Sequence, residues 1–152
     1  MNPRFKATVV NVVARFEQLY AAPSLPMRGG PSHAAKPGIY VLFEDDAPVH
    51  VGRTRNLRKR LHGHCSESHW HASFAFKRAR TDTGMFADYK PGNSRPKLAH
   101  DPVFRPAFLS QVARVRTMHY RFLEVTDPVE QYLLELYAAM EFGTSMDEFD
   151  TH

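Results

Sequence analysis

The stretch from Gly38 to His64 constrains the fold more than any other part of the chain. It reads GIYVLFEDDAPVHVGRTRNLRKRLHGH, in which two β-rich runs flank an Asp-Asp pair. Runs of this kind around a short acidic turn are typical of an antiparallel hairpin. Asn56 then offers an N-cap for a helix that extends to about Cys65. We therefore expect a hairpin followed directly by a strongly basic helix.

The segment before this hairpin is predicted to hold one helix and a connector. Apolar side chains recur at helical spacing from Pro3 to Tyr20, which predicts an amphipathic helix. The following stretch, up to residue 37, is rich in Pro, Gly and Ser and is expected to form a loop. These patterns divide the chain into residues 1–37, the N-terminal helix and connector, and residues 38–152, the main domain.

The second half of the chain holds two further helices and one strand. Asp101 with Pro102 marks a helix start, and residues 119–125 alternate as a strand does. Asp127 is expected to cap a last helix that begins at Pro128, with Glu130 in a capping-box position. That helix should end near residue 142, because Gly143 is a C-terminal stop signal.

Residues 66–100 are harder to interpret. The run HWHASFAFKRAR suits a helix or a strand, and residues 81–100 are expected to form an irregular insertion. The elements together predict an α+β fold, with a small mixed or antiparallel three-stranded central sheet flanked by helices and an extra N-terminal helix.

Length and composition favour an ordinary globular protein. The chain has 152 residues, 43% of them hydrophobic and 24% charged. No apolar run reaches the ~20 residues of a membrane span, and no secretory signal opens the chain. The single cysteine, Cys65, forms no internal disulfide and fits a reducing compartment. We expect a cytoplasmic protein with no membrane partner.

The two signs of charge are segregated along the chain. The net charge is +4, but Lys and Arg are concentrated between residues 53 and 97 and are absent after Arg121. A basic middle segment suits a polyanion such as nucleic acid. A solvated surface of mixed charge is the alternative interpretation.

Four side chains in and after the hairpin form a candidate site. Arg60 and His64 are four residues apart and hence on one helix face. Tyr40 and His50 share a face of the hairpin if the residue numbers of paired residues add up to an even number, as when Leu42 pairs with His50. A base, a guanidinium and a metal-bound carboxylate suit phosphodiester hydrolysis. Each side chain could equally be an ordinary structural or surface residue.

The residues themselves resemble a known family. Gly38-Ile39-Tyr40, His50-Val51-Gly52, and the helix carrying Arg60 and His64 are similar to the core signature of the GIY-YIG nucleases. The resemblance covers roughly residues 38–149. It implies a DNA endonuclease with one divalent metal, Mg²⁺ or Mn²⁺, in its active site.

The resemblance also implies roles for individual residues. Tyr40 matches the tyrosine that serves as general base or orients water, and Arg60 matches the arginine on the scissile phosphate. His64 matches the helix histidine. Glu135, in LLELY, resembles the metal-binding glutamate, and Glu130 is the alternative. We further expect DNA contacts from five residues, which are Arg53, Arg55, Arg58, Lys59 and His71.

Two positions depart from the family pattern. His50 stands where the second motif usually has tyrosine, and Asp147 stands where an asparagine is frequent. An imidazole accepts a proton near neutral pH more readily than a phenol, whose reference pKa is ~10, so His50 could be the base itself. Loss of activity is the other possibility.

Two alternatives to a nuclease stay open. The first is a non-catalytic nucleic-acid-binding module on the same scaffold, with RNA as well as DNA among its possible partners. The second is a structural zinc site, although the spacing of the candidate ligands matches no standard template. Those candidates are His62, His64, Cys65, His69 and His71. Substrate preference, oligomeric state and the roles of residues 77–102 and of the N-terminal helix are not predicted.

Overall fold

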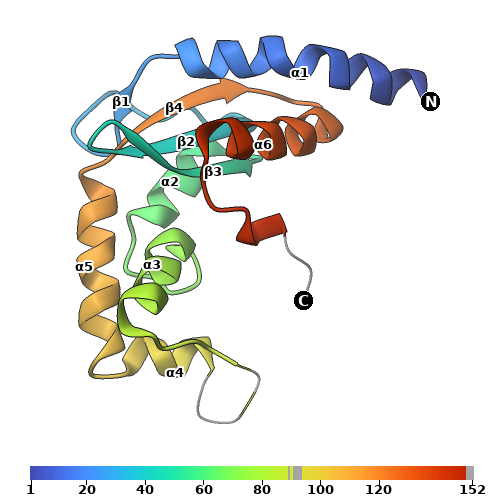
Figure 1. Ribbon diagram of the computed structural model, residues 1–152. Coiled ribbons are helices and arrows are strands. Elements are labelled where there is room, and N and C mark those ends of the chain that lie inside the picture. Colours follow the sequence, from blue (N-terminus) through green and yellow to red (C-terminus); the bar gives the residue numbers. More distant parts are fainter. Residues whose placement is uncertain (89, 91–93, 150–152) are drawn as a thin grey trace. The chain divides into compact units, whose positions relative to one another are not determined.

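The computed structural model describes residues 1–88, 90 and 94–149 of the chain (Figure 1). Residues 89 and 91–93 of the expected insertion therefore lie outside the described part. The chain forms two compact units. Unit 1 comprises Met1–Arg58 and Met118–His152, and unit 2 comprises Lys59–Thr117.

Unit 1 is built on a four-stranded antiparallel sheet in the order β1-β4-β2-β3. Its strands are β1 (Leu25–Pro26), β2 (Gly38–Glu44), β3 (Ala47–Thr54) and β4 (His119–Glu124). The α+β class is confirmed, but the prediction of three strands was wrong. The missed strand is only two residues long and contains a proline, which an edge position tolerates because no ladder N–H is needed there.

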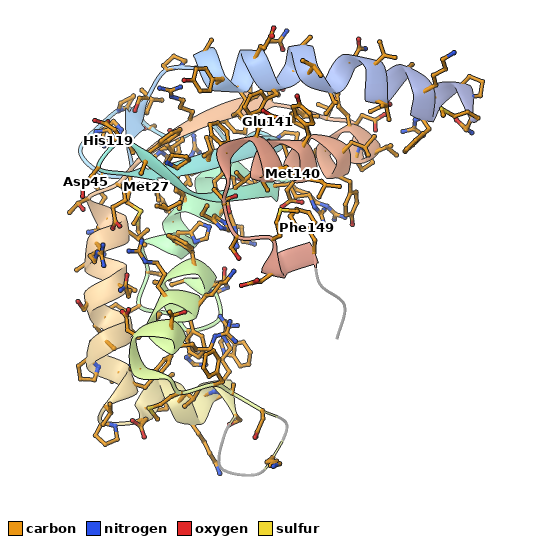
Figure 2. All side chains as sticks on the ribbon, viewed as in Figure 1. Met27, Asp45, His119, Met140, Glu141 and Phe149 are labelled. Atoms are coloured by element: carbon orange, nitrogen blue, oxygen red, sulfur yellow. The ribbon has the colours of Figure 1, made fainter. Side chains whose placement is uncertain are left out.

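The hairpin has the register that places Tyr40 and His50 on one face. Tyr40 pairs with Gly52, and Leu42 pairs with His50. The turn residues Asp45 and Asp46 have φ values of 49° and 65°, as a two-residue type I′ turn requires. Figure 2 shows Asp45 and His119 at the same end of the sheet, in agreement with the pairing of β2 and β4.

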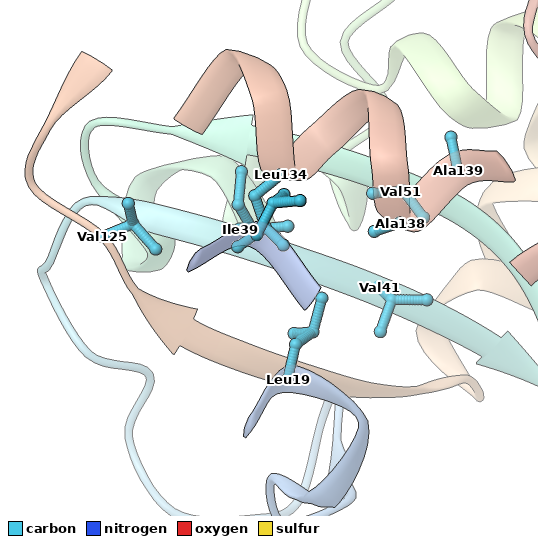
Figure 3. Packing of buried hydrophobic residues seen from close by; sticks show 9 residues of the cluster. Leu19, Ile39, Val41, Val51, Val125, Leu134, Ala138 and Ala139 are labelled. Carbon is cyan, nitrogen blue, oxygen red and sulfur yellow. The ribbon is translucent and has the colours of Figure 1, made fainter. Parts of the chain in front are cut away.

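Two helices pack on the face of the sheet opposite to Tyr40 and His50. They are α1 (Pro3–Ala21) and α6 (Pro128–Phe142), which confirms both predicted helices to within a residue. Figure 3 shows the apolar cluster that they form with β2 and β3. Its central members include Leu19 of α1, Leu134 of α6 and Ile39, each 0% exposed. The N-terminal helix is therefore part of the core of unit 1.

The buried face of α6 differs from the one that the sequence suggested. Val129, Leu133, Leu136 and Met140 recur at helical spacing, which predicts one buried stripe, yet Leu136 and Met140 are 36% and 64% exposed. The sheet side of the helix instead carries Leu134, Glu135, Ala138 and other buried residues. Alanine lets the helix axis approach the sheet closely, which explains the orientation. Asp127 caps this helix through the amides of Val129 and Glu130, as predicted.

Unit 2 is helical in the residues that the structure describes. Helix α2 (Leu57–His64) begins at the end of unit 1, and α3 (Ser73–Thr83), α4 (Arg95–His100) and α5 (Phe104–Arg116) follow. The Phe76 ring lies 4.8 Å from that of Phe104 and 5.8 Å from that of Phe108, which joins α3 to α5. The expected irregular insertion thus contains a short helix, α4.

The remaining described element is a 3₁₀ turn, η1 (Asp147–Phe149), which follows α6. Within the described residues, no helix combines the length and the apolar character that crossing a bilayer requires.

Candidate functional site

Tyr40 and His50 lie beside each other on the hairpin face opposite to α1 and α6. Tyr40 Oη and His50 Nε2 are 3.4 Å apart, a long hydrogen bond, and the ring centroids are 5.8 Å apart. Tyr40 is 0% exposed and His50 is 7% exposed. Because the two side chains are diagonal neighbours, the strand register alone brings them together. A phenol and an imidazole in this arrangement can share a proton.

Gly52 fixes the position of the Tyr40 ring. A Cβ atom at Gly52 would lie 2.6 Å from Tyr40 Cζ and 2.9 Å from Cε1. The ring therefore lies over the glycine, in space that any other side chain would fill. The close approach of the Tyr40 ring thus explains why the third residue of the His50-Val51-Gly52 motif is a glycine.

Arg53 and Glu135 form a second pair in unit 1. Arg53 Nε donates to Glu135 Oε2 at 2.8 Å, and the Arg53 guanidinium lies 3.7 Å from the centroid of the Tyr132 ring. The Glu135 side chain is only 11% exposed, and the Arg53 guanidinium compensates its negative charge there. The Arg53 side chain leaves strand β3 on the sheet face opposite to Tyr40, because Arg53 pairs with Ile39 in the ladder and successive side chains of a strand alternate between the two faces.

Glu130, the alternative metal ligand, is engaged elsewhere. Its carboxylate accepts from Arg15 Nε at 2.8 Å, which ties α6 to α1. Its neighbour Asp127 accepts from Arg4 Nη2 at 2.7 Å. The Arg4 hydrogen bond and the amides of Glu130 and Val129 hold the pKa of Asp127 below its ordinary value of 3.8. Both carboxylates thus have structural partners at the start of α6.

Four of the candidate residues belong to unit 2, namely Lys59, Arg60, His64 and His71. Arg60 and His64 share helix α2, as predicted, and Arg60 Nη2 donates to Ser73 Oγ at 2.9 Å. His64 is 0% exposed, whereas His71 is exposed. The Arg60 hydrogen bond links α2 to the first residue of α3.

The expected DNA-contacting residues have different surroundings. Arg55 and Lys59 are exposed. Arg58 Nε donates to the carbonyl oxygen of His33 at 3.0 Å, which anchors the connector to the start of α2. Arg53 is paired with Glu135, as described above. These contacts give Arg53 and Arg58 structural partners that the sequence did not reveal.

The two units differ strongly in charge. Unit 2 has eleven Lys and Arg against four Asp and Glu, a formal charge of +7 with neutral histidines. Unit 1 has nine Lys and Arg against twelve Asp and Glu, a formal charge of −3. The net charge of +4 therefore conceals one basic and one acidic unit.

In the part of the chain that the structure describes, no three or more His, Cys, Asp or Glu side chains are grouped so that they could hold a metal ion. The five candidate zinc ligands named from the sequence all lie in that described part. Mg²⁺ commonly takes one or two carboxylates and completes its shell with water and phosphate oxygens. A single carboxylate such as that of Glu135 is compatible with such a donor set.

Comparison of the chain with protein-family models, with curated proteins and with solved structures found no match. The sequence reasoning missed the partnership of Arg53 with Glu135 and Tyr132. No local signal could have revealed it, because 82 positions separate Arg53 from Glu135 and the contact depends on how α6 packs on the edge strand β3.

Proposed function

We propose that the protein is a divalent-metal-dependent endonuclease that hydrolyses DNA phosphodiester bonds. The observation that carries the proposal is the Tyr40–His50 pair, with Tyr40 Oη 3.4 Å from His50 Nε2. The resemblance of Gly38-Ile39-Tyr40 and His50-Val51-Gly52 to the GIY-YIG signature supports it, and so does the formal charge of +7 in unit 2.

In the proposed reaction a water molecule attacks phosphorus while the bond from phosphorus to the leaving oxygen breaks. His50 accepts the proton of the water, directly or through the Tyr40 hydroxyl, and the leaving oxygen takes a proton from solvent. For Arg60 the resemblance implies the role of offsetting the charge that develops on the phosphoryl oxygens. His64 has the supporting role that the resemblance implies.

Glu135 is the residue that would hold Mg²⁺ or Mn²⁺. Its carboxylate lies on the α6 side of the sheet and the Tyr40–His50 pair lies on the opposite face, so the resemblance, and not proximity to the pair, supports this role. Bound there, the cation would supply a Lewis acid for the phosphate. Arg53 holds the carboxylate through Oε2 and thereby fixes its orientation.

Burial of the pair favours a second candidate function. Tyr40 is 0% exposed, so the described conformation does not present its hydroxyl to a large substrate. A non-catalytic nucleic-acid-binding module would use the same basic surface without this chemistry. The two functions differ in whether any strand is cut.

Cleavage of supercoiled plasmid, branched DNA and RNA in Mg²⁺ or Mn²⁺ separates these functions. We expect His50→Gln to lower the cleavage rate by about 10²-fold or more, as loss of a general base does. Tyr40→Phe should lower it too, and the double variant should lose little more than His50→Gln alone, because the two groups act as a unit.

Glu130→Gln is the matched control for Glu135→Gln. Both changes neutralise a glutamate of α6 that is paired with an arginine. We expect Glu135→Gln to abolish cleavage and Glu130→Gln to preserve it. Equal rates for Glu135→Gln and the unmodified protein would remove the metal-ligand assignment. DNA binding without cleavage of any substrate would support the non-catalytic module.

A further inference from the structure

Unit 2 contains a cluster of cations around one exposed tryptophan, made of residues that have no role in the proposed reaction. His69 and Trp70 lie between α2 and α3, Arg80 lies on α3, and Arg95 and His100 are the first and last residues of α4. Trp70 is 62% exposed, and it is the only tryptophan of the chain.

Short distances join these side chains. The Arg95 guanidinium lies 4.3 Å from the ring centroid of Phe76 and 5.9 Å from that of Trp70. Arg80 also faces Phe76, at 5.7 Å. The His69 ring lies 4.9 Å from the Trp70 ring and 6.5 Å from the His100 ring. Arg95 Nε donates to the carbonyl oxygen of His69 at 2.5 Å, which ties the start of α4 to this turn.

Neighbouring cations, rather than acids, dominate the electrostatics of the cluster. Burial lowers the pKa of His69, and the charges of Arg95 and His100 lower it further. Burial and the nearby Arg80 lower the pKa of Arg95. Three covered nitrogens have no hydrogen-bond partner in the part of the chain that the structure describes, namely His69 Nε2, Arg80 Nε and Arg95 Nη2.

Like charges that converge without compensation are unfavourable unless an anion joins them. The three side chains are only half-buried, so part of each remains accessible to an anion, although the three nitrogens without a partner are covered. Beside them the Trp70 ring offers a flat apolar surface. An anion attached to a planar ring satisfies both features at once.

We propose that this cluster binds one nucleotide of a single-stranded nucleic acid, with its phosphate at Arg80 and Arg95 and its base stacked on Trp70. Stacking on an exposed aromatic ring beside arginines is how proteins hold unpaired bases. The proposal depends on the proposed function only in its preference for a strand over a free nucleotide.

Because Trp70 is the sole tryptophan, its fluorescence reports directly on the stacked base. The full chain is titrated in excess chelator, where no metal-dependent cleavage occurs, with the oligonucleotide dT12. We expect saturable quenching by dT12. A twelve-residue abasic strand and inorganic phosphate should leave the fluorescence unquenched, because they carry charge without a base. The mononucleotide dTMP should bind more weakly than dT12.

Arg80→Gln tests the phosphate contact, because Arg95 also holds the turn at His69 and its removal could unfold the cluster. We expect Arg80→Gln to weaken dT12 binding about tenfold and to reduce the slope of log K against log salt by about 0.7. Trp70→Ala, followed by anisotropy of labelled dT12, should weaken binding about fivefold or more. Lys97→Gln is the matched control, because it removes one exposed charge from α4 and should change affinity less than threefold.

Unchanged Trp70 fluorescence with dT12, or equal losses in Arg80→Gln and Lys97→Gln, would overturn the site. Tighter binding of dTMP than of dT12 would overturn the preference for a strand. Cleavage of DNA without quenching would leave the proposed nuclease intact and remove this site. Quenching by a protein that never cleaves DNA would support this site and contradict the proposed nuclease.

Discussion

Replacing Gly52 by alanine tests whether the Tyr40 ring lies where the hairpin geometry puts it. The new Cβ atom would lie 2.6 Å from Tyr40 Cζ and 2.9 Å from Cε1, well inside van der Waals contact. Neither side can move easily, because Gly52 belongs to a paired strand and Tyr40 is 0% exposed. The structure therefore predicts a clash rather than a filled cavity.

Two opposing effects decide the size of the change. Alanine is favoured over glycine within a strand by roughly 0.5–1 kcal/mol, because less backbone freedom is lost on folding. Overpacking of a buried site costs roughly 1–3 kcal/mol. The clash prevails, and we expect a net loss of about 1–2 kcal/mol in the free energy of unfolding. For a chain of this size that corresponds to a melting temperature lower by roughly 2–8 °C.

The assay is urea denaturation followed by circular dichroism, with Trp70 fluorescence in parallel to show whether unit 2 unfolds together with unit 1. Tyr40→Leu provides the control background, because leucine lacks the ring atoms that the new Cβ atom would meet. We expect Gly52→Ala to cost at least 1 kcal/mol less in that background than in the unmodified protein. Equal costs in the two backgrounds, or a more stable Gly52→Ala protein, would refute the reasoning.

Two further predictions concern unit 1. Leu19→Ala should lower the free energy of unfolding by about 2–5 kcal/mol, because Leu19 is 0% exposed in the core, whereas Val10→Ala at a 69% exposed position should change it by about 0.5 kcal/mol or less. Equal effects in urea denaturation would show that α1 does not pack on the sheet. Because the pKa of Asp127 is lowered in the folded state, its stabilising contribution exists above the pKa of the unfolded chain and is lost as pH falls below about 4. Melting temperatures from pH 6 to pH 3 should therefore fall more steeply for the unmodified protein than for Asp127→Asn, and parallel curves would contradict this expectation.

The elements with strong local signals were predictable from the sequence. The Asp-Asp turn was predictable, but it sets Glu44 opposite Ala47, and the pairing of Leu42 with His50, which the sequence left as a condition, arises from a β-bulge between Leu42 and Phe43. The last helix carries Asp127 and Gly143 at its two ends, and its bounds were predicted correctly. In each case the information lies within a few residues of the feature.

Features that depend on distant contacts were not predictable. Helix α6 is apolar on nearly all sides, so the stripe that periodicity indicated was not the side that faces the sheet, and the small Ala138 and Ala139 pack there instead. Strand β1 exists only because β4 lies beside it. Helix α3 has cations on a face that also carries aromatic residues, which obscured its amphipathic pattern.

The structure also changes where nucleic-acid attraction is expected. The sequence predicted DNA contacts along the basic run from Arg53 to Arg60. In the structure, however, Arg53 is paired with Glu135, and Arg58 donates to a backbone carbonyl. A cation that already compensates a carboxylate contributes little net field to a distant phosphate. The surplus of +7 belongs to residues 59–117. Neutralising cations of unit 2 should therefore flatten the salt dependence of DNA binding more than neutralising Arg53 does, because Arg53→Gln also frees the charge of Glu135.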